Sequence, residues 1–579
     1  MNSRLSTLIV GLIVAATIVA GLVVGAQRDD RSGPVDLVVL NGRVFTGAGQ
    51  KPAEALAVRG QEILRVGSNR EMKRLAGSAT KVLDAHGGTV LPGFIDGHLH
   101  FVSGGLGMER VNLLDAESFE AISRKIREFA SAKPDSPWVL GRGWYYSPFP
   151  GGLPTRQQLD ELVPDRPAYM TCYDGHTGWA NTAALKLAGI TARTPDPADG
   201  VVVKDPRTGE PTGVLKEAAM GLMSKVLPQP TRADRLKAIR RASEEASRLG
   251  ITSIHEAGTS EAALALFDEV RQSGALSVRV YAALSVTDAM TEADADKFDV
   301  VRQRYAANPQ IKVGAIKVME DGVIEAHTAA MLAPYANNPS AGHANYTPQE
   351  LQRIVAMMDR RRWQVMTHAI GDGAVRMTLD AYAAAAKANP APAAGRRHRV
   401  EHAETIDPTD FPRFKQQNTI VSYMPFHANP TPAQLTVWTT NIGPDRSSRG
   451  WISRTLQQAG ARQVFGSDWP VVALDPRLEI NMAVTRRTAD GQPAAGWLPD
   501  QAISLESAIE SMTAAGAYAS FDETRKGRLA PGLLADIVIL SKDVFAQPPE
   551  RFLDAVVDVT ILGGKVVYSR SPGRGVGTI

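Results

Sequence analysis

The sequence predicts an α/β protein, a (β/α)8 barrel joined to a small β-sheet domain that both ends of the chain form. Three observations carry this prediction. The chain has 579 residues, more than one hydrophobic core usually supports, so we expect at least two packed units. Eight short apolar runs alternate with helical patterns in the middle of the chain. Strand-type runs separated by turn residues occur before and after that array.

Composition narrows the classes of function. Hydrophobic residues at 44% and charged residues at 22% are ordinary globular values, which exclude a disordered, collagenous or multi-span membrane protein. The net charge of +3 and the lack of a basic run predict no nucleic-acid partner. Cys172 is the single cysteine, which excludes an intramolecular disulfide framework and a Cys-based zinc site. Any metal must therefore be bound by His and carboxylate.

The N-terminus carries an export or anchoring signal. Leu8–Ala26 contains no charged residue. Its length lies at the lower edge of what spans a bilayer and also fits the apolar core of a signal peptide. Val24-Gly25-Ala26 fits a cleavage site. We expect residues 1–32 to be a signal peptide or a membrane anchor, with the folded body periplasmic, extracellular or tethered outside the cytoplasm. Membrane contact is then confined to residues 8–26 of the uncleaved chain, and a buried core helix is the alternative.

Residues 33–90 and 526–572 share one sequence pattern, short strand-type runs separated by turns. In the first segment, Asn41-Gly42 between apolar residues is a hairpin signal. In the second, strand-like runs occur at 535–540 and 558–568. We expect these two segments to form one small sheet domain, with two unrelated β appendages as the alternative.

Residues 91–525 alternate helices with strands. Thr231–Gly250 places five apolar residues on one helical face and ends on Gly, and Thr347-Pro348-Gln349-Glu350 is a capping box. The expected strands are 91–98, 251–255, 278–284, 311–318, 364–368, 398–402, 419–424 and 462–468. This count requires that about 109–250 be an insertion, and two more strand-like runs, 138–143 and 168–174, make it imperfect. A doubly wound sheet is the alternative.

Polar residues end several of these strands, where the active face of a barrel lies. His98 and His100 end the first strand, and alternate strand residues point to one side, so both imidazoles can meet one ion. His368, His402 and Asp468 end later strands. A set of His with a carboxylate suits zinc or a similar ion. Each His taken alone also fits a hydrogen-bonded core residue.

Three interpretations of Lys317, which lies at the end of the fourth strand, are compatible with the sequence. An ammonium cannot bind a metal ion, but a desolvated lysine can lose its proton and react with carbon dioxide to form a carbamate. It can instead pair with Glu320 or Asp321, or bind substrate as a cation.

At these positions the sequence resembles a known family. Gly87–His100, which contains Pro92-Gly93-Phe94-Ile95-Asp96-Gly97-His98-Leu99-His100, resembles the first metal-binding strand of the amidohydrolase superfamily. Further motifs are similar to the amidohydrolase family 3, or YtcJ-like, branch: Asp174-Gly175-His176 with Asn181, Ile316-Lys317 with Asp321-Gly322, Thr367–Asp372, Glu401-His402-Ala403, Gly466–Pro470, and Gly527–Gly532 with Ala535-Asp536. The resemblance covers residues 35–568. It implies a distorted (β/α)8 TIM barrel with a small β-sandwich formed from both chain ends. Ile324-Glu325-Ala326-His327 departs from the family pattern, so the substrate cannot be transferred from a relative.

The resemblance also implies a site. His98, His100, Lys317, His368, His402 and Asp468 would bind one or two divalent ions, zinc first, with Lys317 carbamylated. The catalytic residues would be Asp468, His402 and His176. Asp468 would accept the proton of a metal-activated hydroxide and return it to the leaving amine, His402 would polarise the carbonyl, and His176 would orient substrate or stabilise the oxyanion.

We therefore expect a metal-dependent hydrolase of carbon–nitrogen bonds other than peptide bonds, acting on a small-molecule amide, N-acyl or N-formyl compound. His255, His427 and the aromatic run Trp144-Tyr145-Tyr146 are candidates for the pocket wall. A deaminase or cyclic-amide hydrolase is the enzymatic alternative, and a non-catalytic binding barrel is the alternative from a different class. A homo-oligomer is compatible with the sequence.

Overall fold

A computed structural model describes residues 34–173, 175, 177–197, 200–287, 289–571 and 577–578. The signal or anchor predicted at residues 1–32, with its apolar stretch 8–26, lies outside these residues. Within the described part of the chain, no helix combines the length and the apolar character that crossing a membrane requires.

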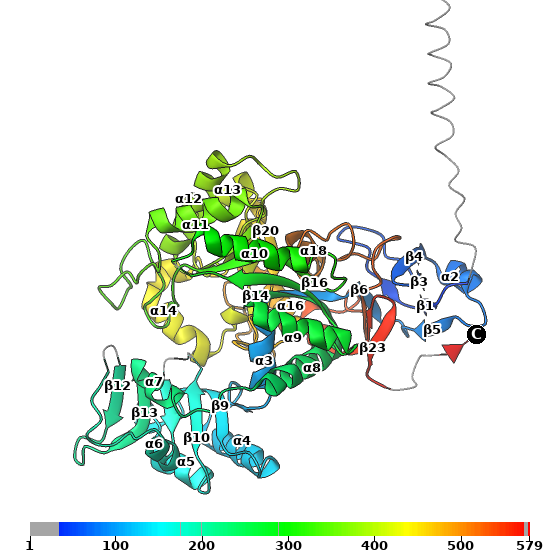
Figure 1. Ribbon diagram of the computed structural model, residues 1–579. Helices are drawn as coiled ribbons and strands as arrows, with labels where there is room; N and C mark the ends of the chain where they lie inside the picture. Colours follow the sequence, from blue (N-terminus) through cyan, green and yellow to red (C-terminus); the bar gives the residue numbers. More distant parts are fainter. Residues whose placement is uncertain are drawn as a thin grey trace, which may run out of the picture.

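An eight-stranded parallel sheet forms the centre of the molecule (Figure 1). Its strands, in spatial order, are β7 (Phe94–Leu99), β14 (Ile251–Thr259), β15 (Arg279–Ser285), β16 (Ile311–Met319), β17 (Gln364–Ala369), β18 (Arg399–His402), β19 (Ile420–Tyr423) and β20 (Arg462–Phe465). Each strand overlaps one of the eight expected runs. Spatial order follows chain order throughout, whereas a doubly wound sheet reverses direction at a switch point. The doubly wound alternative is therefore wrong.

The two edge strands, β7 and β20, approach each other and nearly close the barrel. Just beyond β20, the backbone N–H of Asp468 donates to His98 O at 2.7 Å, and His100 N–H donates to Trp469 O at 2.8 Å. The close approach depends on glycine, because a Cβ at position 466 would lie 2.4 Å from the backbone nitrogen of His98. This closure brings the ends of the first and last strands together.

Helices surround the barrel, and their ends follow the expected local signals. Thr347 caps α11, and its side-chain oxygen accepts from Glu350 N while Glu350 accepts from Thr347 N at 2.8 Å. Thr231 and Asp234 cap α8 in the same way. These helices are α3 (Phe101–Gly107), α8 (Arg232–Arg248), α9 (Glu261–Gln272), α10 (Glu292–Arg304), α11 (Pro348–Arg360), α12 (Asp372–Ala388), α13 (Phe411–Gln416), α14 (Pro432–Ser447), α15 (Ser453–Gln458), α16 (Pro476–Thr485), α17 (Leu505–Ser511) and α18 (Ala514–Ala519). Short 3-10 turns are Pro150–Gly152, Ala218–Met220, Pro408–Asp410, Pro425–Ala428, Pro499–Gln501 and Pro549–Asp554.

Strands from both chain ends form two sheets that share one core. One sheet holds β24 (Gly577–Thr578), β5 (Lys81–Asp84), β1 (Leu37–Leu40), β3 (Ala55–Arg59) and β4 (Glu62–Gly67), with α2 (Asn69–Leu75) beside it. The other holds β2 (Arg43–Val44), β6 (Thr89–Pro92), β21 (Ile537–Leu540), β22 (Val557–Leu562) and β23 (Lys565–Ser569). Val39, Val90 and Ile539 pack in the common core, so the predicted fold class, a distorted barrel with a β-sandwich from both ends, is confirmed.

The hairpin predicted at Asn41-Gly42 is wrong. The flanking strands β1 and β2 belong to different sheets, and the turn carries the chain from one to the other. Asn41 adopts a left-handed conformation, with φ of 54°, which Asn tolerates. Asn41-Gly42 does form a turn, as its residue types predict. The pairing of the flanking strands depends instead on partners that lie far away in the sequence.

A fourth sheet lies beside the barrel, and its strands come between β7 and α8 in the chain. Its strands are β12 (Gly200–Lys204), β13 (Pro211–Glu217), β11 (Thr177–Ala180), β10 (Ala168–Cys172), β9 (Val139–Trp144) and β8 (Val111–Asn112). Its helices are α4 (Phe119–Ala132), α5 (Arg156–Leu162), α6 (Thr182–Leu187) and α7 (Gly221–Ser224). These elements form the cyan lobe beside the barrel in Figure 1. The two surplus strand-like runs are β9 and β10, which removes the conflict in the strand count. The boundaries at 109–250, 33–90, 91–525 and 526–572 stay predictions.

Candidate active site

His98 lies at the end of β7 and is fixed from one side by β18. Its Nδ1 lies 2.5 Å from Glu401 Oε2, and both side chains are fully buried. Arg399, two residues earlier on β18, lies with its Nε 2.7 Å from Glu401 Oε1 and donates to Gly97 O at 2.6 Å. A carboxylate that accepts a hydrogen bond from Nδ1–H fixes the tautomer in which Nε2 is unprotonated and has a free lone pair. His98 Nε2 lies 3.3 Å from Lys317 Nζ and 3.6 Å from Asp468 Oδ1.

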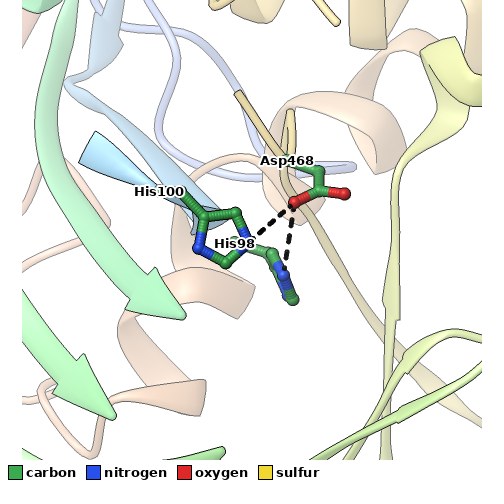
Figure 2. A group of neighbouring side chains, drawn as sticks. All are labelled: His98, His100 and Asp468. Carbon is green, nitrogen blue, oxygen red and sulfur yellow. Dashed lines mark ion pairs between the residues drawn. The ribbon is translucent and has the colours of Figure 1, made fainter. Parts of the chain in front are cut away.

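Asp468 meets both histidines of β7. Its Oδ1 lies 3.2 Å from His100 Nε2 and 3.6 Å from His98 Nε2 (Figure 2). Asp468 has φ of 54° and His402 has φ of 69°, conformations that non-glycine residues adopt only at a cost of about 1–3 kcal/mol each. Such strain is found where the surrounding structure fixes a side chain for function. The backbone bonds across the β7–β20 closure provide that restraint at Asp468.

His402, His368 and His427 complete the histidine group. The rings of His368 and His402 lie 4.5 Å apart, and those of His98 and His402 lie 4.9 Å apart. His368 Nε2 donates to Gly322 O at 3.1 Å. His427, from the 3-10 turn after β19, lies with its Nε2 3.9 Å from Asp468 Oδ2. Asp468 is therefore shared by two groups of histidines.

Lys317 lies among these histidines on β16. Its Nζ lies 3.3 Å from His98 Nε2, and the side chain is buried. Among the described residues it forms no ion pair with Glu320 or Asp321, so that reading of Lys317 is wrong. Asp321 instead accepts hydrogen bonds from Ile370 N and Gly371 N at 3.0 and 2.9 Å and holds the end of β17.

The charge state of the group favours cation binding. Burial lowers the pKa of His98 and His402 well below the usual value, and burial with the charge of Lys317 lowers that of His368 to about 4. Burial alone would raise the pKa of Asp468, but the hydrogen bond with His100 and the charges of the histidines hold it well below its usual range. At neutral pH, His98, His368 and His402 are therefore neutral imidazoles and Asp468 is an ionised carboxylate. His427 differs, because burial is outweighed by its hydrogen bond with Glu404 and by the charge of Asp468, which raise its pKa to about 9.

A divalent metal fits this donor set. The ligand atoms of His98, His100 and Asp468 lie within 4.8 Å of one another, and so do those of His402, His427 and Asp468. Within the described residues, His402 Nδ1 is buried without a hydrogen-bond partner. Buried polar atoms are normally paired, so this nitrogen indicates a missing ligand. Neither trio contains His368 or Lys317.

A cavity of about 440 Å³ opens over these side chains. His100, Lys317, His368, His402, His427 and Asp468 line it. Its remaining wall is mainly apolar and includes Ile370, Leu435, Trp438 and Trp451. The lobe beside the barrel contributes Arg142, Tyr145 and Tyr173. The pocket thus combines one polar floor with apolar walls, as small-molecule sites do.

The structure shows which of the other residues predicted from the sequence line the cavity. His427 and Tyr145 line the cavity, as expected for a pocket wall. His255 does not, because it lies fully buried inside the barrel with Nδ1 2.9 Å from Arg399 Nη1. Trp144 packs in the core of the lobe. His176, predicted to be catalytic, lies outside the described residues.

Sequence reasoning did not predict the observed roles of three residues that hold the site together: Glu401, Arg399 and Asp321. A signal was present for two of them. Arg399 and Glu401 alternate in a buried strand, and charged residues on the inner face of a strand require partners. The sequence did not reveal which partners, because His98 and His255 come from other strands.

Comparisons with known proteins agree with this geometry. The model of the amidohydrolase family matches residues 81–568. The protein LONG AFTER FAR-RED 3 of Arabidopsis thaliana is 31% identical over 546 residues, which cover 92% of this chain and 91% of that protein. The putative amidohydrolase YtcJ of Bacillus subtilis (strain 168) is 29% identical, with 90% of this chain and 96% of that protein covered. The N-substituted formamide deformylase of Arthrobacter pascens is 26% identical, with 93% and 99% covered.

A solved structure shares the fold. An uncharacterized metal-dependent hydrolase from Pyrococcus horikoshii OT3 superimposes with a TM-score of 0.70 at 24% identity, and the match covers 89% of this chain and 99% of that one. The family match runs from β5 of the sandwich through the whole barrel to the returning strands β21, β22 and β23. The chain therefore belongs to the amidohydrolase family, in the YtcJ-like branch that its motifs predict, and it is a metal-dependent hydrolase of carbon–nitrogen bonds other than peptide bonds.

Proposed function

We propose that the protein hydrolyses the amide, N-acyl or N-formyl bond of a small molecule, with Asp468 as the general acid and base. The observation that carries this proposal is the position of Asp468, which lines a 440 Å³ cavity and lies close to two pairs of histidines, His98 with His100 and His402 with His427. The deformylase of Arthrobacter pascens, 26% identical over nearly its full length, supports the N-formyl class.

The residues proposed to hold the metal are His98, His100, Lys317, His368, His402 and Asp468. Imidazoles with a carboxylate favour zinc. A bound divalent ion would supply hydroxide at neutral pH, by lowering the pKa of water from about 16 to about 7, and would polarise the scissile carbonyl. His427 Nε2 is also buried without a hydrogen-bond partner within the described part of the chain, but against the effect of burial Glu404 and Asp468 raise the pKa of this imidazole to about 9, so it binds a metal ion only after losing its proton.

Asp468 would carry the proton. Its ionised carboxylate accepts a proton from the attacking water and returns it to the nitrogen of the leaving amine. The short distance to His100 keeps the carboxylate in place during both transfers. His402 lines the cavity, with its ring 4.9 Å from that of His98, and would polarise the carbonyl. The role of His176 in orienting substrate or stabilising the oxyanion stays a prediction.

Carbamylation of Lys317 is proposed as part of the metal site. Burial lowers the pKa of its amine, which increases the fraction of the nucleophilic neutral form. The ammonium first loses one proton, and the neutral nitrogen then attacks the carbon of carbon dioxide and releases a second proton, so that a cation becomes an anion. That change would turn the repulsive neighbour of His98 into a ligand.

Elemental analysis with a substrate screen tests the proposal. We expect the purified protein to contain one or two divalent ions, and to hydrolyse N-formyl or N-acyl amines until a chelator removes the ions. Re-addition of zinc should restore turnover. A metal-free protein, or turnover that a chelator leaves unchanged after the ions have been removed, would contradict the proposal. Release of ammonia from an amino-substituted ring, without any amide hydrolysis, would favour the deaminase alternative.

We also propose that Leu8–Ala26 directs the enzyme out of the cytoplasm, on the strength of its uninterrupted apolar sequence. Fractionation of cells that express the full chain tests this point. Recovery of the enzyme in the cytosolic fraction with residues 1–32 intact would contradict it.

A further inference from the structure

A second cavity adjoins the active-site pocket. It has a volume of about 720 Å³ and lies between the barrel and the lobe that contains β9. Five residues line both cavities: Leu114, Arg142, Tyr145, Val471 and Val472. The space over Asp468 therefore continues beyond the reacting centre, and a substrate longer than a simple amide can occupy both parts.

Arg142, on β9, stands at the junction of the two cavities. It is half-buried, and its Nη1 donates to the backbone oxygen of Pro470, two residues after Asp468. Among the described residues its other guanidinium nitrogens have no hydrogen-bond partner and no carboxylate pairs with it. Burial lowers the pKa of Arg142, the charge of Asp468 raises it, and the charge of Arg110 lowers it again. This effect of Arg110 agrees with the geometry, because both arginines line the second cavity.

Arg110 lines the second cavity from the turn after α3. Within the described chain its side chain forms no hydrogen bond and no ion pair. The acidic residues on the same wall are Asp115 and Glu117. Asp115 is already paired with Lys125, at 2.5 Å. Arg142 and the exposed Arg110 therefore share the wall with one carboxylate that has no ion pair, the exposed Glu117, which leaves one positive charge in excess among these residues.

We propose that the second cavity binds the carboxylate of the substrate through Arg142 and Arg110, and that the substrate is an N-acyl amino acid whose amide lies beside Asp468. This inference rests on the proposed amide hydrolysis. The planar guanidinium fork matches a carboxylate with two parallel hydrogen bonds. A substrate carboxylate would also balance the positive charge in excess on this wall.

The rest of the cavity wall suits an apolar amino-acid side chain. Met108, Phe426, Trp469 and Leu478 line it around the two arginines. Apolar walls exclude water and strengthen the charge–charge contact. The second cavity therefore favours a ligand that carries one anionic group and is otherwise apolar.

Matched pairs of substrates test the inference. Each pair consists of an N-formyl or N-acetyl amino acid, such as the leucine derivative, and the corresponding N-acyl amine without the carboxylate. We expect the native metal-loaded enzyme to prefer the acid by about 10- to 100-fold in kcat/KM, the range of a hydrogen bond to a charged group. Arg142→Gln should remove most of this preference, Arg110→Gln part of it, and Arg142→Lys should keep part of it. Arg124→Gln, which removes an exposed charge of the same lobe outside the cavity, should leave the ratio unchanged.

The ratio separates recognition from general damage. A variant that merely disturbs Asp468 through Pro470 lowers both kcat/KM values and keeps their ratio, and that result for Arg142→Gln would overturn the inference. A native enzyme that hydrolyses the neutral amine as fast as the acid would also overturn it, while the proposed amide hydrolysis would stand. If neither substrate nor any other amide is hydrolysed, the proposed function itself fails.

Discussion

At the residue scale, two carboxylates beside His98 have different roles. Glu401 is fully buried and held by Arg399, so it orients an imidazole and has no access to substrate. Asp468 borders the cavity and contacts two histidines. The difference follows from position: Glu401 lies within β18, whereas Asp468 lies beyond the last residue of β20.

Substitution of Glu401 tests its orienting role. Glu401→Gln keeps the shape but removes the charge that fixes the His98 tautomer, and it leaves the Arg399 charge less compensated. We expect the metal affinity to fall by about 10- to 100-fold, as for other residues that orient a metal-binding histidine. Competition with a metal-binding dye measures it on the folded protein, and Glu550→Gln, on the surface, is the control. Unchanged affinity would assign Glu401 a purely structural role.

The sequence was informative for residues that end strands. His98, His100, His368, His402 and Asp468 could be predicted because barrel topology places strand ends on one face. His427 was only one candidate among several, since it follows β19 in a turn whose direction depends on packing against α16. Arg142 could not be predicted at all, because its position depends on how the lobe packs on the barrel.

At the scale of elements, the active site depends on the closure between β7 and β20. Gly97 and Gly466 face each other across it, and a Cβ at either position would lie within 2.4 Å of an atom of the other strand. The sequence contained these glycines, but their role follows only from the tertiary approach of the first and last strands. Helix ends were easier to predict, because a capping box such as Thr347–Glu350 is a local interaction.

Gly466→Ala tests the closure. The added methyl group meets the His98 backbone, which cannot move away as a flexible side chain could. We expect a loss of about 1–3 kcal/mol of stability, typical of overpacking, together with weaker metal binding. Urea denaturation and metal analysis measure the two effects. Gly221→Ala, where the new Cβ has no neighbour within 4 Å, should leave both nearly unchanged. Equal behaviour of the two variants would argue against a tight closure.

At the scale of the whole molecule, the two chain ends depend on each other. β21 pairs with β6, with Val538 opposite Leu91, and strands of both ends bury the same core. We expect truncation after Lys526 to expose that core and to cause aggregation, which size-exclusion chromatography detects. A monodisperse, active truncated protein would show that residues 33–90 fold without their C-terminal partner.

The segment before the first strand should behave in the opposite way. Deletion of residues 1–32 removes none of the described strands, so we expect a soluble enzyme that binds metal as the full chain does. Metal content and turnover of the deletion protein measure this. Insoluble protein would place the domain boundary earlier in the chain.

Asp468→Asn tests the central claim most directly. The amide keeps the size and one oxygen of Asp468 but cannot accept the proton of the attacking water. Because several histidines remain, we predict that at least one metal ion stays bound while turnover falls by about 10²- to 10⁴-fold, the range for loss of a general acid–base group. Asp445→Asn, on the surface, serves as the control and should match the native enzyme. Full metal occupancy with near-native turnover in Asp468→Asn would contradict the account.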